Sequence, residues 1–141
     1  MRVFLCSYNG FSLAVPARSV MSIFIFREIT DEKKTAYQTK DSVTYISLPL
    51  LFNAPFLKTH HGIIIKNDDN LSQSDILLST EIESEDDIPL DKFYPVPKTL
   101  GVFGFSLFFS GIHFNEKIRN EPVLLLDPQK LIIKIKKELA S

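Results

Sequence analysis

Short apolar runs recur along this chain, and polar segments or turn residues separate them. Their length and their content of Val, Ile, Leu, Phe and Tyr are typical of strands, because branched and aromatic side chains fit a pleated surface. The runs are Arg2 to Tyr8, Phe11 to Val15, Ile23 to Phe26, Val43 to Leu51, Gly62 to Lys66, Asp75 to Ile82, Ser110 to Phe114 and Pro122 to Leu126. Many short strands with one helix at the end predict a mainly β barrel or sandwich.

The residues between these runs indicate how they connect. Asn9-Gly10 separates the first two runs, and this dipeptide is the strongest short-range signal for a β-hairpin. Ala17 to Ser22 has room for one helical turn before the next strand. The polar stretch Thr30 to Ser42 is expected to form a loop or a weak edge strand. Polar residues Asn115 to Asn120 separate the last two runs, which predicts a second hairpin.

A single helix is predicted after the last strand. Asp127 can accept hydrogen bonds from the first N–H groups of a helix, and Pro128 suits the first helical position because its φ is preset. Leu131, Ile135 and Leu139 then fall on one stripe of that helix. The chain is therefore expected to end in an amphipathic helix that starts at Pro128.

One segment is strongly acidic. Its polar and acidic members are Glu81, Glu83, Ser84, Glu85, Asp86 and Asp87. A calcium loop would need alternating oxygen ligands and a glycine, and the segment has neither. A solvated strand edge that resists aggregation explains the segment better.

Composition narrows the function. The 141 residues are 45% hydrophobic and 23% charged, which is typical of one ordinary globular domain. The net charge of −1 provides no overall field that would attract nucleic acid or an anionic membrane. The aromatics Phe103, Phe105, Phe108 and Phe109 have no basic residue among them, so they are expected in the core or a protein interface rather than as base-stacking platforms.

The chain offers little for catalysis or metal binding. Cys6 is its only cysteine, so it cannot form an internal disulfide, and the short apolar run before it is too small for a signal peptide. The residues His60, His61 and His113 lack the spacing of a zinc site. A Ser/His/Asp triad stays an open alternative because such partners meet only in space. We expect a cytoplasmic protein without enzymatic activity, cofactor, metal or membrane insertion.

Several segments together resemble CheW-like domains, the adaptor modules of bacterial chemotaxis arrays. The opening VFLCSYNGFSLAVPARSVMSI is similar to the family's first strand pair and helical turn. The middle signature is matched by Ile76 to Ile82, Ile88 to Phe93 and Pro95-Val96-Pro97, and the C-terminal one by Ser110-Gly111-Ile112 and Pro122 to Leu131. The resemblance covers nearly the whole chain.

The resemblance implies both a fold and a function. The fold is mainly β, with two small five-stranded SH3-like barrel subdomains packed together, a short helical turn after the first hairpin and a C-terminal α-helix. Residues 1–141 would form one such domain. Its function would be a non-enzymatic adaptor that couples the regulatory domain of a histidine kinase to the cytoplasmic tips of chemoreceptors. The alternatives are a β-barrel module for another two-component partner and an oligonucleotide-binding β-barrel.

One loop departs from the family pattern. Ahead of the central strand the family has a Gly-Val-x-Asn-Leu-Arg-Gly stretch, whereas this chain has TDEKKTAYQTKDS, and the family's arginine falls at about Asp41. A partner matched to the usual adaptor would meet the opposite charge there. The candidate partner-binding residues lie around this loop and on two neighbouring strands. They are Val20, Phe24, Phe26, Asp41, Val43 and Tyr45.

Overall fold

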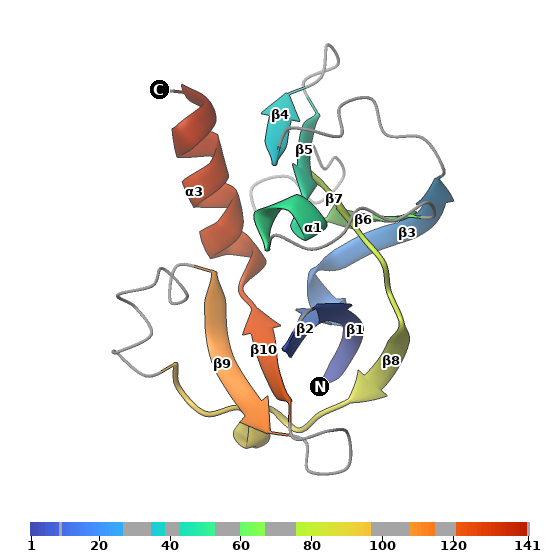
Figure 1. Cartoon of the computed structure of the whole chain (residues 1–141), viewed down its shortest axis with the longest axis vertical. Coiled ribbons are helices and arrows are strands. Elements are labelled where there is room, and N and C mark those ends of the chain that lie inside the picture. Colours follow the sequence, from blue (N-terminus) through green and yellow to red (C-terminus); the bar gives the residue numbers. More distant parts are fainter. Residues whose placement is uncertain are drawn as a thin grey trace. The chain divides into compact units, whose positions relative to one another are not determined.

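A computed structural model describes residues 1–8, 10–26, 35–38, 43–52, 60–66, 76–96, 108–114 and 121–140 of the chain (Figure 1). Its contacts divide the chain into two compact units. Unit 1 contains Met1–Arg18 and Ile82–Glu138, and unit 2 contains Ser19–Glu81 with Leu139–Ser141. In sequence, therefore, the main part of unit 2, Ser19–Glu81, is inserted between the two parts of unit 1.

Unit 1 is built on one five-stranded sheet, here called sheet A. Its strands follow the spatial order β8 (Ser84–Asp87), β1 (Arg2–Tyr8), β2 (Phe11–Pro16), β10 (Pro122–Leu126) and β9 (Phe109–Phe114). The central β2 and β10 are parallel, whereas the other pairs are antiparallel. This parallel pair and the antiparallel pair of β1 with β8 join the two separate parts of unit 1.

Both predicted hairpins of unit 1 are confirmed. Tyr8 pairs with Phe11 across the first turn, where Gly10 has a φ of 89°, a conformation that a residue without Cβ adopts at little cost. The second hairpin joins β9 to β10. The short 3-10 helix η1 (Ala17–Ser19) then follows β2. It is shorter than the turn predicted over Ala17 to Ser22, because the next strand already begins at Val20.

One apolar cluster forms part of the core of unit 1. It contains residues from β1, β2, β10 and the segment after β8, with three partly buried neighbours beside it. The buried members are Val3, Ala14, Ile88, Val123 and Leu125, and the neighbours are Met1, Leu5 and Phe93. The edge strand β8 contributes no residue to this cluster, since all four of its residues are exposed.

The terminal helix α3 (Pro128–Ala140) begins at the predicted residue. The N–H of Lys130 donates a hydrogen bond of 3.2 Å to Oδ1 of Asp127, so Asp127 caps the helix. Leu131 and Ile135 are buried as expected, whereas Leu139 is exposed. The apolar stripe therefore covers only the first two and a half turns or so of the helix.

Unit 2 is built on a second five-stranded sheet, sheet B. Its spatial order is β3 (Val20–Phe26), β6 (His60–Ile65), β7 (Ile76–Thr80), β5 (Thr44–Ser47) and β4 (Ala36–Gln38). β5 and β7 are parallel, and the other neighbours are antiparallel. The weak edge strand expected within Thr30 to Ser42 corresponds to β4.

The run Val43 to Leu51 differs from its prediction as a strand. Only β5 is extended, and the helix α1 (Leu48–Leu51) follows it directly. Ser47 caps α1, because its hydroxyl accepts a 3.4 Å hydrogen bond from the N–H of Leu50. Pro49 lies in the first turn, where a helix needs no N–H donor, so it supports the helix start rather than ending a strand.

The two five-stranded sheets match the predicted strand numbers, but neither sheet is closed into a barrel. In unit 1 the segment after β8 reaches β9 through the 3-10 helix η2 (Leu90–Lys92) and makes one isolated bridge, between Tyr94 and Ile112. Pro95 follows Tyr94 and has no N–H to extend this pairing. In unit 2, within the described residues, the two edge strands β3 and β4 do not pair.

Candidate interaction surface

Metal binding finds no support in the described part of the chain. No group of three or more His, Cys, Asp or Glu side chains there could hold a metal ion. His113 is placed by its neighbours: its Nδ1 lies 3.1 Å from the carbonyl oxygen of Lys92, and its ring packs against Phe93. None of the helices in the described residues is long and apolar enough to cross a membrane. The exposed edges of the two sheets are the remaining candidates for an interaction surface.

Unit 1 presents an acidic edge at β8. Glu85 accepts a hydrogen bond from the Arg2 guanidinium on β1, and this bond lowers the pKa of the Glu85 carboxyl and raises the pKa of Arg2. Glu83 accepts a 2.7 Å hydrogen bond from the hydroxyl of Ser7, and Asp87 lies 2.8 Å from the amino group of Met1. The solvated strand edge predicted from the acidic residues is thus confirmed, with polar partners on the adjacent strand.

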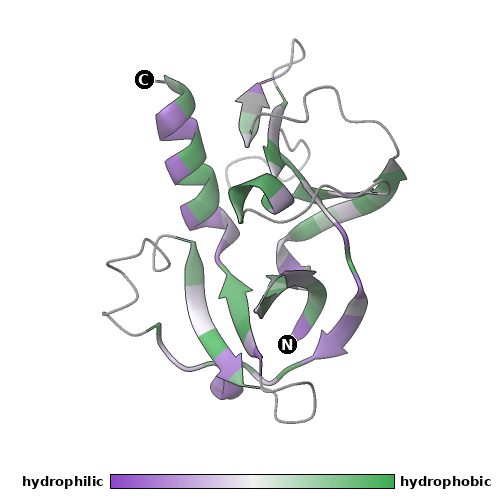
Figure 2. Cartoon of the chain, viewed as in Figure 1, coloured by the Kyte–Doolittle hydropathy of each residue, from purple (hydrophilic) through white to green (hydrophobic). Residues whose placement is uncertain are grey.

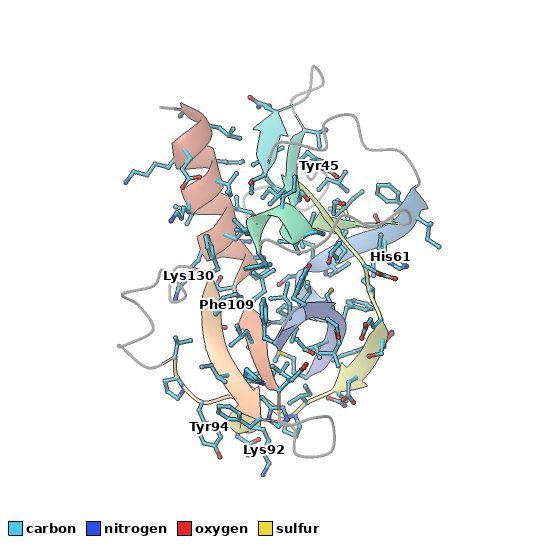
Figure 3. All side chains as sticks on the ribbon, in the orientation of Figure 1. Tyr45, His61, Lys92, Tyr94, Phe109 and Lys130 are labelled. Atoms are coloured by element: carbon cyan, nitrogen blue, oxygen red, sulfur yellow. The ribbon has the colours of Figure 1, made fainter. Side chains whose placement is uncertain are left out.

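Tyr94 and Lys92 lie beside the end of β9 (Figure 3). Tyr94 and Ile112 exchange two backbone hydrogen bonds, with N to O distances of 2.7 and 2.8 Å. Phe114, two residues further along β9, and Tyr94 both expose most of their side chains. This edge of sheet A therefore carries aromatic side chains, but its main chain is partly occupied by the bridge.

Unit 2 has an apolar edge at β3. One row of side chains runs across sheet B in register: Ile46 pairs with Leu78, Leu78 with Ile63, and Ile63 with Ile23. The first three are fully buried, whereas Ile23 is 36% exposed. Because Ile23 belongs to the outermost strand, no described strand flanks its outer side. The core row thus reaches solvent at β3.

The rest of β3 continues this exposure. Met21 and Ile25 each lie two residues from Ile23 along the strand, and Ile25 is 66% exposed. On the opposite face, Phe24 is 41% exposed, and its ring lies over Gly62 of β6, where an added Cβ would be 2.6 Å from its Cζ. β3 thus presents apolar side chains on both faces. It contains no charged residue, and most of its ribbon has the colour of hydrophobic residues (Figure 2). We call Met21, Ile23, Phe24 and Ile25 the β3 surface.

The predicted site residues occupy different positions. Val20 is half-buried at the start of β3, and Phe24 belongs to the β3 surface. Phe26 ends the strand, and its side chain is outside the described features. Val43 is half-buried just before β5. Asp41 lies outside the described residues.

Tyr45 requires a correction. Its side chain is only 4% exposed, so it is a core residue and is not accessible to a partner. Its strand, β5, was expected to lie beside β3, but the hairpin of β6 and β7 separates the two. The reason is that β5 pairs in parallel with β7 and antiparallel with β4, which uses both of its edges.

Sequence reasoning missed Met21, Ile23 and Ile25 as surface residues. A signal was present, because β3 is apolar at nearly every position and contains no charge, whereas a strand with one solvated face alternates apolar and polar residues. Such a pattern also fits a strand buried on both faces. Only the position of β3 at the end of sheet B separates these two interpretations.

Comparison with known proteins identifies a fold. No family model matches the sequence, and no curated protein matches it either. Among solved structures, the chain is similar to the scaffolding protein CheW from Thermoanaerobacter tengcongensis, with a TM-score of 0.60 over 89% of this chain and 88% of that one. The identity between the two is 15%, so the similarity concerns the fold alone. The chain therefore has a CheW-like fold.

Proposed function

We propose that this chain is a non-enzymatic adaptor of a bacterial chemotaxis array, in which residues 1–141 act as one CheW-like domain. It would couple the regulatory domain of a histidine kinase to the cytoplasmic tip of a chemoreceptor, and it would work in the cytoplasm. The fold that it shares with a scaffolding protein supports this proposal. The observation that carries it is the apolar, uncharged β3 surface at the edge of sheet B.

The β3 surface has the character of a protein interface. In such interfaces a few large apolar anchors provide most of the binding free energy, and polar residues around them exclude water. Ile25 and Phe24 are suitable anchors, since each leaves a large apolar area in water. Val20, half-buried at the start of the strand, would extend the contact. Phe26, Val43 and Asp41 stay predicted members of the same site.

The test compares matched variants in binding to a purified kinase regulatory domain and to a receptor-tip fragment. Ile25→Asp places a charge on the β3 surface, whereas Ile133→Asp places the same charge at an equally exposed isoleucine of α3, each being 66% exposed. We expect Ile25→Asp to weaken at least one of these complexes by roughly tenfold or more, which corresponds to about 1.4 kcal/mol. Ile133→Asp should leave both complexes unchanged.

The charge at Asp41 needs a separate variant. Asp41→Arg restores the cation that the CheW-like pattern has at this position and should strengthen binding to a partner of the usual kind. If neither affinity changes, the charge argument is wrong. If the natural chain stays folded and monodisperse but binds neither fragment, the adaptor function itself is wrong.

A further inference from the structure

The two sheets present four edge strands, which differ in how well they resist pairing with another chain. An exposed sheet edge can accept a strand from a neighbouring molecule, and proteins commonly prevent this with charged residues, very short edge strands or a covering segment. Comparing the four edges of this chain shows which of them lacks such protection.

Three edges carry a protective feature. In unit 1, β8 has the sequence SEDD, so three of its four residues are acidic, and all four are exposed. At the other edge of sheet A, the segment containing Tyr94 covers part of β9 through the bridge to Ile112. In unit 2, β4 has only three residues and therefore offers few backbone groups to an incoming strand.

The fourth edge, β3, lacks these three features, and its pairing with β6 is irregular only at its start, between Val20 and Ser22. It has seven residues and no charge, and within the described part of the chain it pairs with β6 alone. The core row of sheet B ends there at Ile23, which is partly exposed, while Ile63 beside it is fully buried. A further strand beside β3 would continue this row and remove Ile23 and Ile25 from water.

We propose that β3 pairs antiparallel with β3 of a second copy of this chain across a two-fold axis, so that two copies of sheet B join into one continuous sheet. A strand is the expected occupant, because β3 has apolar side chains on both faces and a strand contacts both, whereas a flat surface would cover one. The two-fold axis makes the paired strands antiparallel and the interface self-complementary.

The distribution of charge favours β3 of a second copy over β8 as the partner of β3. Pairing β3 with β8 of another copy would set Glu85, Asp86 and Asp87 beside the apolar β3 surface and remove their carboxylates from water, which is unfavourable. Two β3 strands bring no charge together and so meet no like-charge repulsion. The apolar row that ends at Ile23 in one copy would also be continued by the same row of the other copy.

This inference rests on the proposed function, since it assigns a second use to the same strand. Pairing between copies and binding of an array partner would exclude each other at β3. The dimer would therefore be a form in which the adaptor surface is covered, and a partner would bind by displacing the second copy. The apparent affinity for a partner should then fall as the concentration of the chain rises.

Sedimentation over a range of protein concentrations measures the association directly. We expect a reversible equilibrium between monomer and dimer. Hydrogen exchange at the amides of residues 20–26 should slow as the concentration increases, because pairing adds backbone hydrogen bonds to β3, whereas exchange in β8 should not change. A chain that stays monomeric throughout, or a dimer in which β3 exchange is unaffected, would overturn the proposal.

Two variants locate the contact. Ile25→Lys and Ser22→Lys each place a cation on an exposed position of β3, so either can be used if the other fails to fold. Each should raise the Kd of the dimer by roughly tenfold or more, since both copies then carry a charge at the shared edge. Ile133→Lys, at the equally exposed isoleucine of α3, is the control and should leave the Kd unchanged. Equal effects at Ile25 and Ile133 would overturn the proposal.

These outcomes separate the two proposals. A monomeric chain that still binds the kinase or receptor fragment contradicts the dimer and leaves the adaptor function in place. A dimer that is sensitive to Ile25→Lys but binds neither fragment contradicts the adaptor function and supports the pairing of β3.

Discussion

Gly111 of β9 lies so close to Phe93 that a Cβ atom added to the glycine would be 2.9 Å from the Cβ of Phe93. The same added atom would be 3.4 Å from the carbonyl oxygen of Tyr94. Gly111 thus lets the segment after β8 approach β9 closely enough for Tyr94 to form its bridge with Ile112. The segment containing Tyr94 can cover this edge of sheet A because residue 111 is a glycine and has no side chain in the way.

The first prediction follows from the close contact between Gly111 and Phe93. Gly111→Ala should destabilise the protein by about 1–3 kcal/mol, the usual cost of overpacking, because the Cβ of Phe93 moves only with its backbone. Gly62→Ala is the matched control, since its nearest neighbour is the end of the Phe24 ring, which can rotate away. Denaturant unfolding should therefore show the larger loss for Gly111→Ala. A larger loss for Gly62→Ala would contradict this explanation.

The second prediction concerns the cap of α3. Asp127→Ala removes the acceptor for the N–H of Lys130 and should cost about 1 kcal/mol in the free energy of unfolding. Asp127→Asn keeps an oxygen in the same place and should stay close to the natural protein. Denaturant midpoints of the three proteins test this, and an unchanged midpoint for Asp127→Ala would rule the cap out as a source of stability.

The third prediction compares two isoleucines of α3. Ile135 is buried and Ile133 is mostly exposed. Ile135→Ala should cost roughly 2–5 kcal/mol because it leaves a cavity, while Ile133→Ala should be nearly neutral. Both substitutions change helix propensity similarly, so the difference between their unfolding free energies reports burial. Similar losses for the two variants would mean that α3 is not docked through Ile135.

The fourth prediction concerns the Arg2 and Glu85 pair. The hydrogen bond from Arg2 lowers the pKa of Glu85 in the folded protein, so the pair stabilises the fold above the pKa that this glutamate has when unfolded. That contribution is lost as the pH falls through the lower, folded-state pKa. The effect should be small, because both side chains are exposed to solvent.

Unfolding measured against pH tests this pair. The natural protein should be slightly more stable than Glu85→Gln near neutral pH, and the difference should shrink in acid. A carboxyl titration followed by NMR should show the pKa of Glu85 returning to the usual glutamate range in Arg2→Leu. A difference in stability that grows on acidification would contradict the assignment.

The sequence alone determined the features that depend on neighbouring residues. Asn9-Gly10 specified the first hairpin, because the turn needs a residue that tolerates the positive φ found at Gly10. Asp127-Pro128 specified the start of α3, because the cap and the first turn are formed within a few residues. The strand Pro122–Leu126 was also predicted with its observed bounds.

Pairings between distant segments were decided only by the tertiary structure. The apolar residues of β5 fit either a place beside β3 or one beside β7, because every strand offers the same kinds of main-chain donors and acceptors to a neighbour. The structure places β5 beside β7. The assembly of unit 1 from two separate stretches depends on the parallel pairing of β2 with β10 and on the antiparallel pairing of β1 with β8, which no local pattern encodes. The sequence predicts a strand at α1 because its residues, LPLL, follow β5 directly and extend one apolar run of the chain.

In the candidate site, too, the sequence determined one property and the tertiary structure another. Tyr45 and Ile23 both belong to runs of the sequence that are mainly apolar, and the sequence assigned Tyr45 to the surface while overlooking Ile23. In the fold, Tyr45 lies in a strand with neighbours on both sides and is buried, whereas Ile23 lies in the outermost strand and is partly exposed. Hydrophobicity is a property of the residue, but exposure depends on the strands that stand beside it, and those come from elsewhere in the chain.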